Sequence, residues 1–239
     1  MPDRFDHPRT APQVKICCIA DLAEARLAIA HGAAALGLVS AMPSGPGVID
    51  EAVIAEVAAA VAAEAPVVQT FLLTSLTEAE AIVAQHRRCG TTTLQLVDTL
   101  TPGELPRLRA ALPAVRLVQV IHVCGEASVE EALAAAPHVN AVLLDSGAPQ
   151  AAVKQLGGTG RTHDWATSRR IRDALAERDV PLYLAGGLRP DNVAAAVAQV
   201  APYGLDLCTG VRQHGRLDAV RLAAFFAALG VTEGRRNPA

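Results

Sequence analysis

The chain has 239 residues, of which 51% are hydrophobic and 19% are charged. This amount of apolar material can form a large core, so disorder is excluded as the dominant state. A formal net charge of −3 argues against a protein that binds duplex nucleic acid, because such proteins usually present a basic surface. The sequence has no run of about 18 apolar residues, so we expect no contact with a membrane interior.

The N-terminal residues lack the apolar segment that a secretory signal requires. The five cysteines are an odd number, which does not fit a framework of paired disulfides. We therefore expect reduced thiols and a cytoplasmic location.

Eight short apolar runs recur along the chain, separated by longer segments with helical periodicity. The runs begin at Val14, Ala34, Val67, Thr92, Arg116, Val139, Val180 and Gly204. The intervening segments 21–32 and 50–64 carry acidic residues early and apolar residues at three- and four-residue steps, which is typical of helices. Strands that alternate with helices require a parallel sheet, and eight such units predict a parallel eight-stranded (β/α)8 barrel, the TIM barrel.

The chain shows no linker or change of composition that would mark a second domain. We predict one barrel domain over residues 14–229, with flexible tails at 1–13 and 230–239. Capping-box patterns at 77–80 and 128–131 predict two of the helix starts.

Three glycine-rich turns follow the later strands, at 157–160, 186–187 and 209–210. In TIM barrels the loops after the seventh and eighth strands often bind a phosphate group. Glycine allows backbone N–H groups to approach the anion closely, although such pairs also serve as plain turns. We predict phosphate binding by Gly158, Thr159, Gly160, Gly186, Gly187, Thr209 and Gly210.

An acid and a base are the next candidates, since catalytic residues of this fold come from the C-terminal ends of strands. Cys17 lies near the end of the first strand, and Lys15 precedes it by two residues and so shares its side of the strand. A lysine near a thiol favours the thiolate, which can accept a proton. Asp145 ends the sixth apolar run, where partial desolvation would raise its pKa. Alternatively, Cys17 is a small buried apolar residue and Asp145 a helix cap.

Several further motifs occur in a fixed order along the chain. They are Lys15-Ile16-Cys17-Cys18, Gln95-Leu96, Asp145, Gly157-Gly158-Thr159-Gly160 with Asp164-Trp165, Leu184-Ala185-Gly186-Gly187-Leu188 with Asn192-Val193, and Thr209-Gly210-Val211. This ordered set resembles the phosphoribosylanthranilate isomerase family of tryptophan biosynthesis, from about Val14 to Leu229.

The resemblance implies an Amadori rearrangement, which converts an aminoaldose into an aminoketose. In that reaction an acid protonates the ribose ring oxygen and a base removes the proton from C2. By resemblance, Cys17 is the base, Asp145 is the acid, and the partner is a small phosphorylated sugar. We expect no cofactor and no metal, since no group of His, Cys and Asp has ligand spacing. Either a monomer or a homodimer is compatible with the sequence.

The chain also departs from the family pattern in four places. The loop after the second strand reads Met42-Pro43-Ser44-Gly45-Pro46-Gly47, where the family has Ser-Pro-Arg with an arginine expected to hold the anthranilate carboxylate. Glycine or proline cannot replace a bidentate arginine. Val97-Asp98 stands where the family has His-Gly, and Arg212 stands where it has an acidic residue. Cys18 replaces a glycine, and we expect its side chain to point away from the barrel interior.

We predict that Lys15, Gln95, His122 and Arg212 contact the substrate. His122 ends the fifth strand and is not part of the family pattern, so it either binds the altered substrate end or bonds a neighbouring carbonyl. Arg212 either replaces the missing positive charge or lies in solvent.

Three functional hypotheses follow. The first is an isomerase of the phosphoribosylanthranilate type. The second is a related barrel enzyme that isomerises a different phosphorylated sugar or aminosugar, which the missing loop arginine favours. The third is a non-catalytic barrel that binds a phosphorylated metabolite.

Overall fold

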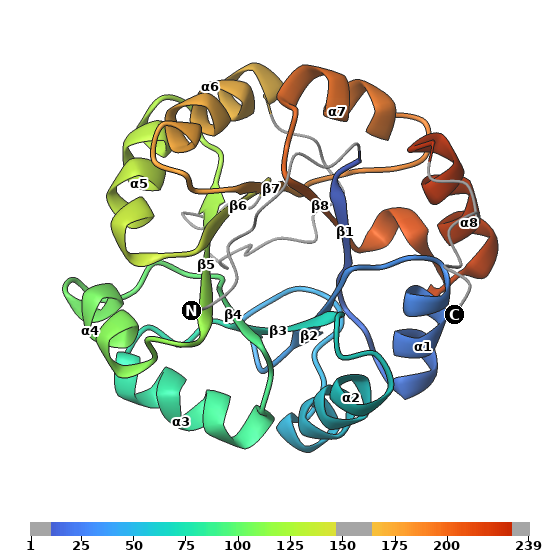
Figure 1. Ribbon diagram of the computed structural model, residues 1–239, viewed down its shortest axis with the longest axis horizontal. Coiled ribbons are helices and arrows are strands. Elements are labelled where there is room, and N and C mark those ends of the chain that lie inside the picture. The colour runs from blue at the N-terminus through green and yellow to red at the C-terminus, as the bar shows by residue number, and fades with distance from the viewer. Residues whose placement is uncertain (1–10, 147–163, 231–239) are drawn as a thin grey trace.

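The computed structural model describes residues 11–146 and 164–230. Within these residues eight parallel strands pair in chain order, and β1 pairs with β8 to close the barrel. The helices surround the strands as an outer ring (Figure 1). The TIM barrel predicted from the alternating pattern is confirmed.

The strands of the barrel are β1 (Gln13–Ile16), β2 (Ala35–Val39), β3 (Gln69–Thr74), β4 (Thr93–Leu96), β5 (Arg116–His122), β6 (Ala141–Asp145), β7 (Leu182–Leu184) and β8 (Gly204–Leu207). The helices are α1 (Leu22–Ala30), α2 (Glu51–Glu64), α3 (Ala79–Cys89), α4 (Glu104–Ala111), α5 (Ala127–Ala135), α6 (Trp165–Ala176), α7 (Val193–Val200) and α8 (Ala219–Ala228). Shorter elements are the 3-10 helices η1 (Ala136–His138) and η2 (Thr209–Val211) and the hairpin β9 (Arg212–Gln213) and β10 (Arg216–Leu217). Each apolar run of the sequence contains or overlaps one barrel strand.

Aspartates begin three of the helices in the manner expected for N-caps. The side chain of Asp21 accepts from the N–H of Glu24 at 2.9 Å, and Asp164 and Asp218 cap α6 and α8 in the same way. Each such cap satisfies backbone donors that have no partner within the helix.

The two capping boxes predicted from the sequence are wrong. Helix α3 begins at Ala79, whose N–H donates to the Glu104 carboxylate at 2.8 Å, so the next helix supplies the cap. Ser128 lies inside α5, where its hydroxyl accepts from the N–H of Cys124 at 2.9 Å. A tertiary contact in one case and a local turn in the other replaced the predicted pattern.

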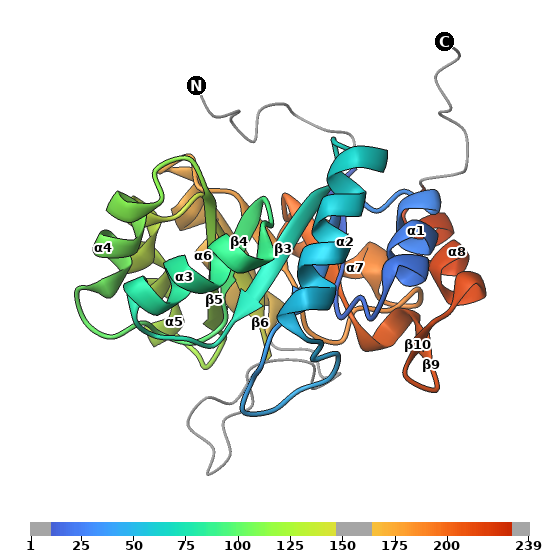
Figure 2. The ribbon, with the colours of Figure 1, turned by 90° about the horizontal axis from the view of Figure 1, so that it is seen from below.

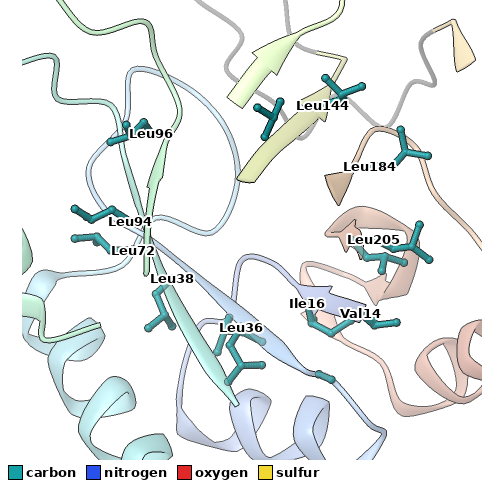
Figure 3. Close-up of a cluster of buried hydrophobic side chains, with 14 of the residues drawn as sticks. Val14, Ile16, Leu36, Leu38, Leu72, Leu94, Leu96, Leu144, Leu184 and Leu205 are labelled. Atoms are coloured by element: carbon teal, nitrogen blue, oxygen red, sulfur yellow. The ribbon is translucent and has the colours of Figure 1, made fainter. Parts of the chain in front are cut away.

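Apolar side chains on the outer face of the strands pack against the surrounding helices. Leucines such as Leu36, Leu72, Leu94 and Leu205 are fully buried in this layer. Figure 3 shows Leu36, Leu72 and Leu94 on the neighbouring strands β2, β3 and β4, and Leu205 on β8. Burying one such side chain stabilises a fold by about 1.5–3 kcal/mol, so this layer is the main source of stability.

Aromatic rings fill the barrel interior toward the N-terminal ends of its strands. The ring of Tyr183 lies 6.0 Å from Phe71 and 5.5 Å from Tyr203 between centroids, in edge-to-face geometry. Gly204 makes room for Tyr183, because a Cβ atom there would lie 2.4 Å from the tyrosine ring. The floor of the barrel is therefore packed, and Gln95, Asp145 and Asp206 lie nearer the C-terminal ends of their strands.

The loops at the C-terminal ends of the strands extend to one side of the molecule. Figure 2 shows the segment that joins β2 to α2 and the β9–β10 hairpin on this side. None of the helices within the described residues has the length and apolar character needed to cross a membrane.

Candidate active site

A pocket opens at the C-terminal ends of the barrel strands. All eight strands or the residues directly after them contribute to its wall. The lining includes Cys17, Val39, Leu73, Gln95, Val120, Asp145, Ala185 and Asp206, together with the turns at 186–187 and 209–210. The pocket therefore brings together Cys17 from the first strand, Asp145 from the sixth and two of the three predicted glycine turns.

Asp206, one of the lining residues, belongs to a buried ion pair. Lys15 Nζ and Asp206 Oδ1 are 2.8 Å apart, on residues that are register partners in β1 and β8. Burial by itself lowers the pKa of Lys15, but the Asp206 carboxylate outweighs this effect and raises it above its ordinary value. Lys15 therefore stays charged. It does not itself line the pocket, but its ammonium contacts Asp206, which does.

Asp206 was not among the residues predicted from the sequence, although the first and eighth apolar runs contain a signal for it. The eighth apolar run contains a single carboxylate at an inward position, and the first run contains a single lysine. Because closure of a barrel makes the first and last strands neighbours, two opposite charges in these strands indicate a buried pair.

Cys17 follows β1 and is 6% exposed. Its N–H donates to the carbonyl of Leu207 at 2.7 Å, which fixes the end of β1 against β8. Gly37 of β2 provides room for the thiol, because a Cβ atom there would lie 2.9 Å from Cys17 Sγ and 3.0 Å from Lys15 Nζ. The thiol and the ammonium therefore lie on the same side of β1, as its alternation predicted.

Asp145 ends β6 and lines the pocket. Burial raises its pKa above the ordinary value, and the nearby Asp206 carboxylate acts in the same direction. The N–H of Ser146, which donates to Asp145 at 2.7 Å, and the charges of His122 and Lys15 oppose the shift without cancelling it. A carboxyl group with a raised pKa retains its proton more readily, which suits a general acid.

Two predicted phosphate-binding turns lie side by side in the pocket wall. Gly186 and Gly187 follow β7 with φ of 87° and 61°, values that glycine adopts without strain. Thr209 and Gly210 begin the 3-10 helix η2 after β8. Gly210 packs so closely on the first turn that a Cβ atom would lie 2.1 Å from the carbonyl oxygen of Leu188. The remaining predicted phosphate ligands, Gly158, Thr159 and Gly160, lie outside the described residues.

Gln95 and His122 occupy different positions relative to the pocket. Gln95 lines it, and its side-chain oxygen is buried without a partner among the described residues. His122 lies beside Asp145 in the ladder between β5 and β6 but does not line the pocket. Its Nε2 is 3.2 Å from the carbonyl oxygen of Val97, and its Nδ1 is buried without a partner among the described residues.

Arg212 lies behind the pocket wall. Its guanidinium donates to the Glu24 carboxylate at 3.0 Å and to the backbone carbonyls of Cys17 and Cys18. The side chain is 8% exposed, so it does not lie in solvent, and it is not among the residues that line the pocket. These contacts hold the segment after β1 in place.

The expectation that Cys18 points away from the barrel interior is wrong. Cys18 lines the pocket, and its sulfur lies 2.8 Å from that of Cys208. The reason is local: β1 ends at Ile16, and Cys18 adopts a left-handed conformation with φ of 62°, which breaks the alternation of a strand.

The loop after β2 covers one end of the pocket with neutral side chains. Met42, Ser44, Gly45 and Pro46 line the cavity there. Across all the lining residues that the structure describes, none is a lysine, arginine or histidine. No group of three or more His, Cys, Asp or Glu within the described ranges is arranged to hold a metal ion.

The fold and the pocket at its C-terminal end define a TIM-barrel enzyme. Residues 14–228 match the family model described as N-(5'-phosphoribosyl)anthranilate (PRA) isomerase, and the chain belongs to this family. It is 34% identical over 219 residues to the N-(5'-phosphoribosyl)anthranilate isomerase of Trichormus variabilis, covering 91% of this chain and 98% of that protein.

Solved structures agree with this assignment. The phosphoribosylanthranilate isomerase of Thermotoga maritima superimposes with a TM-score of 0.75 at 28% identity, covering 92% of this chain and 98% of that one. Another structure of the enzyme, in complex with reduced 1-(o-carboxyphenylamino)-1-deoxyribulose 5-phosphate, superimposes with a TM-score of 0.72 at 26% identity over 92% of this chain and 98% of that one.

Proposed function

We propose that the chain isomerises N-(5'-phosphoribosyl)anthranilate to 1-(o-carboxyphenylamino)-1-deoxyribulose 5-phosphate in tryptophan biosynthesis. Membership of the family supports the reaction class. The observation that carries the proposal is that Cys17 and Asp145, from strands on different sides of the barrel, line one pocket beside two glycine turns.

In the proposed mechanism Asp145 donates its proton to the ribose ring oxygen. The bond between that oxygen and C1 breaks, and the nitrogen lone pair forms a C=N bond at C1. Cys17, as the thiolate, then removes the proton from C2, which gives an enolamine that rearranges to the ketone. The reaction is an isomerisation, so it needs no external oxidant or reductant.

The remaining polar groups have roles in binding. Lys15 lies on the same side of β1 as the Cys17 thiol, and its ion pair with Asp206 keeps the ammonium in place. The backbone N–H groups of the turns at 186–187 and 209–210 are proposed to hold the phosphate group. The amide oxygen of Gln95, which has no partner within residues 11–146 and 164–230, suits a substrate hydroxyl.

The experiment compares the purified wild-type protein with Cys17→Ala and Asp145→Asn, using N-(5'-phosphoribosyl)anthranilate as substrate. Loss of a general acid or base should lower kcat by about 10²–10⁴-fold. In parallel, the wild-type gene should restore growth without tryptophan to a strain that lacks this isomerase. A wild-type protein that neither turns over the substrate nor restores growth would overturn the assignment, and a variant within a few-fold of wild type would remove that residue from the mechanism.

One observation favours a second candidate, an isomerase for a related phosphorylated aminosugar without a carboxylate. The loop after β2 and the rest of the described lining supply no cation to a carboxylate on the aromatic ring. A buried carboxylate without a cationic partner is unfavourable. The substrate end that faces Met42 and Pro46 would then be uncharged.

A matched pair of substrates distinguishes the two candidates. N-(5'-phosphoribosyl)anthranilate and its aniline analogue differ only in the carboxylate, so the ratio of their kcat/KM values reports recognition of that group. A preference of tenfold or more for the anthranilate compound, about 1.4 kcal/mol, supports the first candidate. An equal or reversed preference supports the second.

We further propose that the enzyme acts in the cytoplasm with free thiols, as a monomer or homodimer. The five cysteines are unbonded in the structure, which supports a reducing compartment. Light scattering of the purified chain distinguishes the two oligomeric states.

A further inference from the structure

Two cysteines of the pocket wall have no part in the proposed acid–base chemistry. Cys18 follows the proposed base directly, and Cys208 follows β8 directly before the turn at 209–210. Both line the pocket, and their sulfur atoms are 2.8 Å apart although the residues are 190 positions apart in the chain. The closure of the barrel between β1 and β8 brings them together.

The surroundings of Cys18 hold its thiol toward Cys208. The left-handed backbone at Cys18 turns the side chain to the pocket, and the Pro46 carbonyl lies 3.5 Å from its sulfur. On the loop side, a Cβ atom at Gly47 would lie 2.4 Å from Cys18 Cβ, so the loop packs tightly against this residue. The thiol therefore has little freedom to turn away.

The surroundings shift the pKa values of the two thiols in opposite directions. A hydrogen bond with Cys17, a second with Cys208 and burial together raise the pKa of Cys18. The hydrogen bond with Cys18 lowers the pKa of Cys208; burial opposes this effect, and the Arg212 guanidinium reinforces it. Cys208 is also the less buried of the two, so its sulfur is the one that an oxidant reaches first.

We propose that Cys18 and Cys208 form an oxidisable dithiol, a modification site that closes to an intramolecular disulfide on exposure to a hydroperoxide and inhibits the enzyme. The inhibition rests on the proposed function, whereas formation of the disulfide does not.

The chemistry balances with hydrogen peroxide as the oxidant. The Cys208 thiolate attacks one peroxide oxygen, and the O–O bond breaks. Hydroxide leaves, and Cys208 becomes a sulfenic acid. The Cys18 sulfur then attacks the Cys208 sulfur, the S–O bond breaks, and the departing hydroxide takes the Cys18 proton. The hydroxide from the first step takes up the proton that Cys208 released on becoming a thiolate. The two sulfurs thus lose two electrons in total, and one peroxide becomes two waters.

The geometric change is small but falls on the active site. A disulfide bond is about 2.05 Å long, so the sulfurs must approach by less than one ångström from 2.8 Å. The movement displaces the residues next to Cys17 on one side and next to Thr209 on the other. A displacement of this size in a catalytic group can reduce the rate by about 10²-fold.

Mass spectrometry of the peroxide-treated protein tests the dithiol without reference to activity. We expect a loss of about 2 Da, for two hydrogens, and a cross-linked peptide pair that a reductant separates. Cys17 and Cys18 are adjacent and fall in one peptide, so Cys17→Ala shows which of the two is bonded; the cross-link should persist in this variant. It should also persist in the controls Cys89→Ala and Cys124→Ser. It should disappear in Cys18→Ala and in Cys208→Ala. Absence of the cross-link, or its loss in Cys17→Ala, would overturn the proposal.

Isomerase activity is measured on the same samples, each relative to its own untreated protein. Treatment should lower wild-type activity at least tenfold, with recovery after reduction, and should leave Cys208→Ala largely unaffected. An equal loss of activity in Cys208→Ala would assign the inhibition to oxidation of Cys17. It would overturn the proposal that the disulfide inhibits the enzyme. If the reduced wild-type protein has no isomerase activity, the proposed function fails. The cross-link result still shows whether Cys18 and Cys208 form a disulfide.

Discussion

Gly37 faces the barrel interior in β2, where replacement by alanine would insert a methyl group between two groups of the active site. The new Cβ atom would lie 2.9 Å from Cys17 Sγ and 3.0 Å from Lys15 Nζ. Atoms in close-packed interiors contact at about 3.5–4.0 Å, so the neighbours or the strand must move by roughly 0.5–1 Å. The Cα atom of Cys17 is 3.1 Å away, which limits the ability of the thiol to move alone.

This displacement has a predictable effect on the rate. A misplacement of about 1 Å in a catalytic group can reduce the rate by about 10²-fold, which corresponds to about 2.7 kcal/mol in the activation free energy. We therefore expect Gly37→Ala to lower kcat by 10- to 100-fold. The assay is steady-state turnover of N-(5'-phosphoribosyl)anthranilate, with urea unfolding to measure stability.

Gly204→Ala is the matched control, because Gly204 also faces the interior but lies at the floor of the barrel. Its new Cβ atom would lie 2.4 Å from the ring of Tyr183, so this variant should lose stability without a selective loss of kcat in the folded fraction. A Gly37→Ala enzyme with kcat within threefold of wild type would contradict this prediction. Equal effects of both substitutions on kcat per folded molecule would refute it as well.

Three further outcomes are expected. Burial raises the pKa of Asp145 above its ordinary 3.8, so the stability contributed by the protonated carboxyl is present below about pH 4 and is lost as pH rises through the raised value. Asp145→Asn should therefore be more stable than wild type at neutral pH in urea titrations, with a difference that shrinks toward pH 4; a constant difference would contradict this. Asp206→Asn leaves the buried ammonium of Lys15 without its partner and should destabilise the fold by about 3–5 kcal/mol, and combination with Lys15→Met should recover part of this loss. Gly210→Ala places a Cβ atom 2.1 Å from the Leu188 carbonyl oxygen and should raise KM about 10- to 100-fold through lost charge-assisted hydrogen bonds to phosphate; an unchanged KM would remove this turn from the binding site.

The barrel could be predicted from sequence because its pattern is repetitive. Each strand is buried on both faces and therefore reads as a continuous apolar run, as in 34–39 or 139–145. The capping boxes failed for a different reason, since their signal is only four residues long. At Ala79 a glutamate from the next helix supplied the acceptor, and no local pattern contains that information.

The site could be predicted only in part. Cys17 follows β1 directly and Asp145 ends β6, and the fold alone places residues at such positions in one pocket. Cys18 could not be placed correctly, because the left-handed backbone that turns it inward lies beyond the end of the strand. The contacts of Arg212 with Glu24 and the carbonyls after β1 join residues almost two hundred positions apart, which only the closed barrel brings together.

The most direct measurement is a structure of this protein with reduced 1-(o-carboxyphenylamino)-1-deoxyribulose 5-phosphate bound. We expect the phosphate at the amides of 186–187 and 209–210, with Cys17 Sγ facing C2 of the ligand and the Asp145 carboxyl facing the oxygen on C4. A ligand bound outside this pocket, or one whose C2 lies beyond reach of the thiol, would contradict the proposed chemistry.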